Sequence, residues 1–204
     1  MTKVFLNYRK ADTDFGAHVL DQKLSERFGS DQVFLASKSI PLGAAWESAM
    51  MAAVAESDAV LVIIGRHWLT ASDENGQLIR QENDFVRREI LLARELGKLI
   101  IPVRLQAPRF TATDLPAELS WLPECQDIEV RFRSAQADVD HLANRLRVLL
   151  PGLDRTTRIT TPPDSRIYVN SGKITNLWQM ENTKIAGDFN IAPQVHYHHE
   201  ADDE

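Results

Sequence analysis

The stretch NDFVRREILLARELGKLIIPV, residues 83–103, decides the fold because it reads as an amphipathic helix that runs directly into a buried strand. At the helical period, one broad apolar arc contains Phe85, Val86, Ile90, Leu92, Ala93 and Leu96. The opposite face, where solvent is expected, contains Arg87, Arg88, Arg94 and Glu95. Glu89 nevertheless falls inside the apolar arc. A carboxylate at a buried position needs a reason.

Two reasons for Glu89 follow from the residues alone. A buried carboxylate can have a structural role, at the edge of a cavity or in an ion pair with a nearby arginine. It can also be an active-site acid, because burial raises the pKa of a carboxyl group and a carboxylate stabilises a cation that develops during a reaction. The choice between these two readings depends on the other motifs of the chain.

Composition narrows the class of protein. The 204 residues suffice for one domain of about 150 residues with an extension, and Cys125 is the single cysteine, so no internal disulfide can form. The start, MTKVFLNYRK, enters a strand pattern without a secretory segment, and no apolar run approaches the roughly 18 residues of a membrane helix. The net charge of -6 argues against nucleic-acid binding. We therefore expect a soluble cytoplasmic protein with neither a membrane nor nucleic acid as partner.

Apolar strands alternate with helical patterns along the chain. Strands are expected at 3–8, 32–35, 59–64, 99–105 and 127–132. Helices are expected at about 14–28, 45–55, 85–97 and 138–150, with a long loop at 65–83 and a helical turn near 115–122. This alternation predicts an α/β domain with a parallel five-stranded sheet and helices on both faces.

Ligands of such sheets bind beyond the carboxyl ends of the strands. Three polar or aromatic segments follow strands there: YRK (8–10), ASKSIPLGAAW (36–46) and GRHWL (65–69). Trp46, at a helix start, is either a core residue or a flat ring beside the cleft that stacks on a base. His67 has no nucleophile motif beside it, which favours a surface or packing residue.

Cofactor and metal motifs are weak. No glycine-rich phosphate loop occurs, so a dinucleotide site of the Rossmann or P-loop type is unsupported. The terminal VHYHHE, residues 195–200, gathers histidines, but it lacks cysteine partners. We predict no metal site.

Three motifs in order resemble those of the TIR domain family, of the kind common in bacterial immune effectors, over about residues 1–150. FLNYRK (5–10) is similar to the family's first box, F-[IL]-S-Y-R-R. SIPLGAAWESAM (39–50) is similar to its second-strand loop and following helix, and DFVRRE (84–89) to its W-x-x-x-E catalytic helix. The resemblance implies a flavodoxin-like sheet and, as in catalytic members, cleavage of the nicotinamide glycosidic bond of NAD+.

The resemblance also implies roles for individual residues. Glu89 matches the catalytic glutamate, and NAD+ is then a substrate, with no cofactor required. Nicotinamide leaves as a neutral group, so the ribose becomes oxocarbenium-like and one carboxylate suffices to stabilise it. Pro41 and Gly43 of the mobile loop are assigned to assembly. The implied substrate-binding residues are Tyr8, Arg9, Ser37, Trp46 and Phe85.

The sequence departs from the family pattern at three positions. Asn7 stands in place of Ser, Phe85 in place of Trp, and Ala36 where many members have Asp. The missing Asp affects the expected ribose contacts and the identity of the product more than the reaction. Two functions follow: an NAD+ glycohydrolase or cyclase, which the inward Glu89 favours, and a non-catalytic TIR adaptor that acts only by assembly.

A change in composition separates the expected TIR domain, residues 1–153, from an extension of strand or disordered character. The segment 154–165 contains turn formers and reads as a linker. In 166–192, KIT and KIA recur, and the segment resembles the short amyloid signalling motifs that follow effector domains in some bacterial immune proteins. Residues 193–204 are expected to be a disordered tail.

This resemblance implies self-association through the extension as well as through the TIR domain. Ile174, Ile185 and Phe189 are the expected assembly residues. A receptor protein with a similar segment would be the partner that templates fibril growth. The alternative is a disordered tail, or a hairpin docked on the domain.

Overall fold

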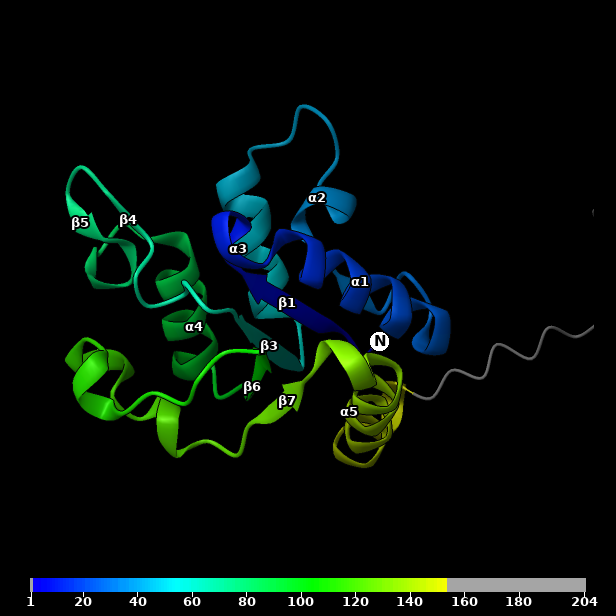
Figure 1. Cartoon of the computed structure of the whole chain (residues 1–204). Coiled ribbons are helices and arrows are strands. Elements are labelled where there is room, and N and C mark those ends of the chain that lie inside the picture. Colours follow the sequence, from blue (N-terminus) through cyan, green and yellow to red (C-terminus); the bar gives the residue numbers. More distant parts are fainter. Residues whose placement is uncertain (1, 154–204) are drawn as a thin grey trace, which may run out of the picture. The chain divides into compact units, whose positions relative to one another are not determined.

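The computed structural model describes residues 2–153, and its centre is a parallel five-stranded sheet of order β2-β1-β3-β6-β7 (Figure 1). The expected linker, assembly segment and tail, with Ile174, Ile185 and Phe189, lie outside the described residues. Helices lie on both faces of the sheet, which confirms the expected α/β class. The strands are β1 Val4–Tyr8, β2 Val33–Phe34, β3 Ala59–Ile64, β6 Leu99–Leu105 and β7 Ile128–Val130.

The central strand β3 is buried along its whole length, as its unbroken apolar sequence AVLVII predicts for a sheet covered on both sides. It pairs in parallel with β1, from Val4 opposite Ala59, and with β6, from Ala59 opposite Leu99. The two edge strands are shorter than expected. The strand β2 has two residues and β7 has three.

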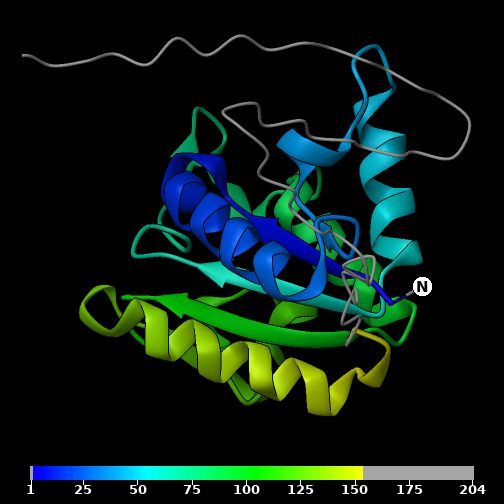
Figure 2. The same cartoon turned by 90° about the vertical axis from the view of Figure 1, so that its right-hand side faces the viewer.

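The helices form two layers. On one face, α1 (Lys10–Phe28) and α5 (Ala135–Leu149) lie side by side, as Figure 2 shows, over the side chains of one set of alternating strand positions. On the other face, α3 (Trp46–Glu56) and α4 (Phe85–Glu95) cover the remaining set, together with the segment that follows β6. Short 3-10 turns occur at 78–80, 112–114, 117–119, 122–124, 132–134 and 151–153.

Three local features differ from the expectation. The helix α1 begins at Lys10 instead of about residue 14, with an irregular residue at Thr13 (φ −130°, ψ 22°). The short helix α2 (Ala36–Ser39) replaces part of the expected loop after β2. The loop 65–83 contains a hairpin of β4 (Ser72–Asp73) and β5 (Gly76–Gln77). Its two-residue turn is Glu74 and Asn75, and Gly76, which begins β5, has φ of 105°, a conformation that glycine adopts without strain.

The helix α4 corrects two assignments made on the helical wheel. Arg87 is buried instead of facing solvent: its guanidinium donates to the carbonyl of Arg80 and lies 3.4 Å from the Glu118 carboxylate. Segments that pack beside α4 cover this position. Leu96, expected in the apolar arc, is exposed because the helix ends at Glu95. None of the described helices is long and apolar enough to span a membrane.

Candidate active site

The carboxyl group of Glu89 lies between α4 and the sheet and is 4% exposed. The helix α4 begins at Phe85 because Asp84 caps it, accepting a hydrogen bond from the backbone N–H of Arg87 at 3.1 Å. One turn later, Glu89 points inward, as the wheel predicts. Its Oε2 atom accepts a hydrogen bond of 2.7 Å from Nδ2 of Asn7 on β1.

This environment favours the neutral form of Glu89. Burial is the main cause, and it raises the pKa of Glu89 to about 8. The hydrogen bond from Asn7 acts in the opposite direction and lowers this pKa; the charge of Asp84 raises it, and that of Arg88 lowers it. A carboxyl group that titrates near neutral pH is unusual for glutamate and is typical of active sites.

Arg9, at the carboxyl end of β1, is buried against Asp84. Its guanidinium donates two parallel hydrogen bonds of 2.9 and 2.8 Å to that carboxylate. The two terminal nitrogens of Arg9 and both carboxylate oxygens of Asp84 are therefore used in this pair, and Nε of Arg9 is buried without a hydrogen-bond partner among the described residues. Asp84 thus caps α4 and also binds the helix to the end of β1.

Trp46 and Phe85 bring the start of α3 onto the start of α4. Their ring centroids are 4.4 Å apart at an interplanar angle of 56°. Trp46 is 50% exposed, so it lies at the edge of the fold, not in the core. The guanidinium of Arg88 stacks over Phe85 at 4.9 Å and pairs with Glu47 at 2.7 Å. An aromatic pair and an ion pair thus join the two helix starts beside Glu89.

Tyr8 and Ser37 lie together at the carboxyl end of β1. Burial raises the pKa of Tyr8, a hydrogen bond with Ser37 lowers it, and the charges of Asp14 and Glu89 raise it. The Ser37 hydroxyl also lies 3.1 Å from Nε2 of His18, whose Nδ1 contacts the Asp14 carbonyl at 2.8 Å. Because a carbonyl only accepts, Nδ1 is the donor in the contact with Asp14.

Pro41 and Gly43 lie in an exposed turn between α2 and α3. The N–H of Ala44 donates to the Pro41 carbonyl at 3.2 Å, and Gly43 has φ of 82°, which fits the third position of a type II turn. Leu42, between them, is fully exposed. The turn therefore has an apolar side chain at the surface.

The remaining candidates have structural contacts. The backbone N–H groups of Gly65 and His67 donate to the two carboxylate oxygens of Asp12, which fixes the loop after β3. The side chain of His67 is exposed, whereas Trp68 is fully buried and stacks on Phe110. Within residues 2–153, no group of three or more His, Cys, Asp or Glu side chains is arranged to hold a metal ion.

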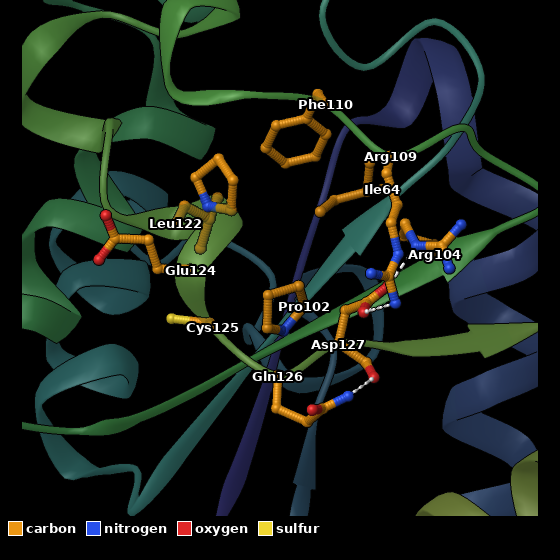
Figure 3. Close-up of a pocket in the computed structure, with 11 residues that line it drawn as sticks. Ile64, Pro102, Arg104, Arg109, Phe110, Leu122, Glu124, Cys125, Gln126 and Asp127 are labelled. Carbon is orange, nitrogen blue, oxygen red and sulfur yellow. Dashed lines mark hydrogen bonds and ion pairs between the residues drawn. The ribbon is translucent and has the colours of Figure 1, made fainter.

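Two pockets open elsewhere on the domain. One, of about 190 Å³, lies beside β6; its lining includes Phe110 and Asp127, and Arg104 and Arg109 both pair with Asp127 (Figure 3). The other, of about 320 Å³, lies between β2 and α3. Glu89 lines neither of them. Its carboxyl group is closed to solvent in this conformation.

The comparison with protein families identifies this arrangement. Residues 4–147 match the family model described as TIR domain. The chain belongs to the TIR domain family. Among solved structures, this TIR domain is similar to a chain of "the activated Roq1 resistosome directly recognizing the pathogen effector XopQ (TIR domains)". The TM-score is 0.53 at 13% identity, over 72% of this chain and 99% of that one, which shows a shared fold. No curated protein sequence matches the chain.

The TIR fold thus brings the expected residues together in pairs, not in one open cleft. The ring of Phe85 packs against Trp46, and Tyr8 forms a hydrogen bond with Ser37. Three partners were not found from the sequence: Asn7 for Glu89, Asp84 for Arg9, and His18 for Ser37. An Asp directly before a helix is a recognisable capping signal, but no spacing rule links positions about 80 residues apart.

Proposed function

We propose that this TIR domain cleaves the bond between nicotinamide and ribose in NAD+, and that Glu89 carries the reaction. The observation that supports this proposal is the buried Glu89 carboxyl group, whose pKa is raised to about 8, at the carboxyl end of a parallel sheet. Ligands of open parallel sheets bind at this edge. A carboxyl group buried without an arginine partner is also hard to explain as a structural ion pair: its hydrogen-bond partner is the amide of Asn7.

The chemistry needs one carboxylate. As the bond from C1′ of the ribose to the nicotinamide nitrogen breaks, its electron pair goes to nicotinamide, which leaves as a neutral molecule. The ribose then carries positive charge, and ionised Glu89 stabilises it. Water captures the ribosyl cation to give ADP-ribose and a proton. Capture by a nitrogen of the adenine within the same molecule gives a cyclic product instead.

The conformation described is a resting one under this proposal. Glu89 is shielded, and Trp46 with Phe85 joins the helix starts beside it. Substrate access then requires these contacts to separate. Association of TIR domains, through the exposed turn of Pro41 and Gly43 and through residues 166–192, would supply the energy for that change. A receptor with a similar segment would start the assembly in the cytoplasm during immune or cell-death signalling.

One observation supports the adaptor function. Glu89 has a hydrogen-bond partner inside the domain, and the exposed Leu42 turn offers a surface for association. A TIR domain that only assembles would need nothing more. The adaptor remains the second candidate function.

Incubation of the purified chain with NAD+ separates the two functions. Products are identified by liquid chromatography with mass spectrometry, for the dilute protein and for the protein assembled on a surface or with seeds. We expect nicotinamide together with ADP-ribose or its cyclic form, released faster by the assembled protein. Intact NAD+ in both samples, with the chain folded and assembled, would support the adaptor.

A further inference from the structure

Asn7 is a polar residue in an otherwise apolar strand. It is 0% exposed, and its neighbours in β1 include the buried apolar residues Phe5 and Leu6. Side chains alternate along a strand, so Asn7 points to the same face as Phe5, toward α4. A buried carboxamide in place of an apolar side chain calls for a specific use of its polar atoms.

The Asn7 amide is fixed by two contacts with the same helix. Its Nδ2 donates to the carbonyl of Val86 at 3.1 Å and to Oε2 of Glu89 at 2.7 Å. Both hydrogens of this nitrogen are therefore used, and both partners are oxygen acceptors, which determines the orientation of the amide. The other atom, Oδ1, is buried and has no hydrogen-bond partner among the described residues. The nitrogen contacts are kept although the oxygen is left unpaired.

The consequence for Glu89 is both geometric and electrostatic. Because Oε2 of Glu89 accepts the hydrogen bond from Asn7 on β1, Oε1 of Glu89 is the oxygen that remains for another contact. A donated N–H bond favours a carboxylate over a neutral carboxyl group, and burial favours the neutral group. Asp84 and Arg88 on the same helix act in opposite directions, and Tyr8 on β1 also senses the charge of Glu89. Asn7 is the neighbour whose neutral side chain contacts the carboxyl group directly.

We propose that Asn7 is a positioning residue for Glu89, which holds Oε2 against β1, leaves Oε1 to face the substrate, and favours the ionised carboxylate that the reaction uses. This inference rests on the proposed NAD+ cleavage for its catalytic meaning. Its statement about the Glu89 carboxyl group is independent of any activity. A serine at position 7, with its single hydroxyl hydrogen, could not donate to the Val86 carbonyl and to Oε2 of Glu89 at once.

The decisive variant is Asn7→Leu, which has a similar volume and no hydrogen-bond donor. Phe5→Leu is the matched control, because it alters packing on the same face of the same strand without touching Glu89. The titration of Glu89 is followed by NMR of ¹³C-labelled glutamate carboxyl groups, with Glu89→Gln to assign the signal. We expect Asn7→Leu to move the Glu89 midpoint upward by about one pH unit, the scale of one lost hydrogen bond, and Phe5→Leu to leave it in place.

Activity provides the second readout. For the assembled protein, we expect the rising limb of the pH profile of kcat/KM to move upward in Asn7→Leu, so that the loss of rate is larger at pH 6 than at pH 9. An unmoved Glu89 midpoint, or an equal loss of rate at every pH in a folded Asn7→Leu variant, would overturn the inference. If wild-type protein cleaves no NAD+, the proposed function fails, and the NMR midpoint still decides whether Asn7 controls the charge of Glu89. If Asn7→Leu does not fold, Asn7→Ala, which also lacks a side-chain donor, is measured in the same way, with the same two deciding outcomes.

Discussion

The side chains of Arg9 and Asp84, 75 residues apart in the chain, form a two-bond ion pair in which only 5% and 7% of the two side chains are exposed. Arg9 directly follows β1, and Asp84 directly precedes α4. The pair therefore fixes the start of the helix that carries Glu89 against the strand that carries Asn7. Arg9, expected from the first box to bind substrate, has a structural contact in this conformation.

We expect Arg9→Met to lower the free energy of unfolding by about 3–5 kcal/mol, because it leaves the Asp84 carboxylate buried and unpaired. Asp84→Asn is the complementary variant, since Asn also caps helices, so its loss of stability reports the ion pair and not the cap. Urea unfolding of both single variants and of the double variant gives the coupling energy. Full stability of Arg9→Met together with a raised KM for NAD+ would show that Arg9 serves the substrate instead.

We expect Glu89→Gln, which is nearly isosteric, to lower NAD+ cleavage by about a hundredfold or more, because it removes the stabilising charge. Glu95→Gln on the same helix is the matched control, since Glu95 is exposed at the end of α4. Rates of nicotinamide release are compared for assembled proteins whose circular dichroism matches the wild type. Near-normal turnover by folded Glu89→Gln would refute the assignment of Glu89.

The same substitution has a predictable effect on stability. Because the pKa of Glu89 rises from 4.5 to about 8 on folding, the native state holds a proton that the unfolded state releases between these values. The contribution of Glu89 to the free energy of unfolding is therefore fully present below about pH 4.5, and it is lost as the pH rises to about 8. Glu89→Gln stays neutral, so its advantage over the wild type should grow with pH in that window, by at most about 1.4 kcal/mol per pH unit.

Urea unfolding at pH 5, 6.5 and 8 measures this difference, and the Glu95→Gln variant corrects for surface charge. A constant difference between Glu89→Gln and the wild type over this range would mean that the carboxyl group is ionised throughout.

Trp46→Ala should reduce NAD+ cleavage or assembly more than stability. Trp46 is half exposed and loses one aromatic contact with Phe85, a loss of about 1–2 kcal/mol. Trp68 is the matched comparison, because it is fully buried and its replacement by Ala should cost about 3–5 kcal/mol. Urea unfolding and nicotinamide release are measured on both variants. A large fall in stability of Trp46→Ala with unchanged specific activity would contradict the prediction.

The proposed assembly segment can be tested separately from the domain. A peptide of residues 164–195 should form fibrils with cross-β spacing, since repeated apolar and amide side chains satisfy one another when copies stack. Deletion of the segment should leave a folded TIR domain that cleaves NAD+ slowly. Fibre diffraction and seeded aggregation test the peptide. A peptide that stays soluble at high concentration, with and without seeds, would rule out this mode of assembly.

The strands and the inward Glu89 could be predicted because they depend on local periodicity. The run AVLVII of β3 is buried as predicted, and in α4 the inward positions of Val86, Glu89, Ile90 and Ala93 are confirmed, whereas Leu96 is exposed. The hairpin after β3 was missed because its strands have only two residues each, although the segment from Glu74 to Gly76 contains the turn formers Asn and Gly.

The contacts that define the candidate site could not be predicted in the same way. A helical wheel shows which face of α4 carries Arg87, but it does not show that the segment around Glu118 packs over that face. Asn7 was noted only as a departure from the family pattern, and its bond to Glu89 joins positions 82 residues apart. Such pairs depend on the register between β1 and α4, which is set by packing of the whole domain.

The short outer strands of the sheet also affect what happens when many copies of the domain are crowded together. The strand β2 offers two residues at one edge and β7 offers three at the other, so each edge presents few free N–H and C=O groups to a stray strand. Neighbouring domains are therefore poorly suited to merge into a continuous intermolecular sheet. Under the proposed assembly, the domains would then associate through side chains of helices and loops. The domain can reach high local concentration while each copy keeps its own fold.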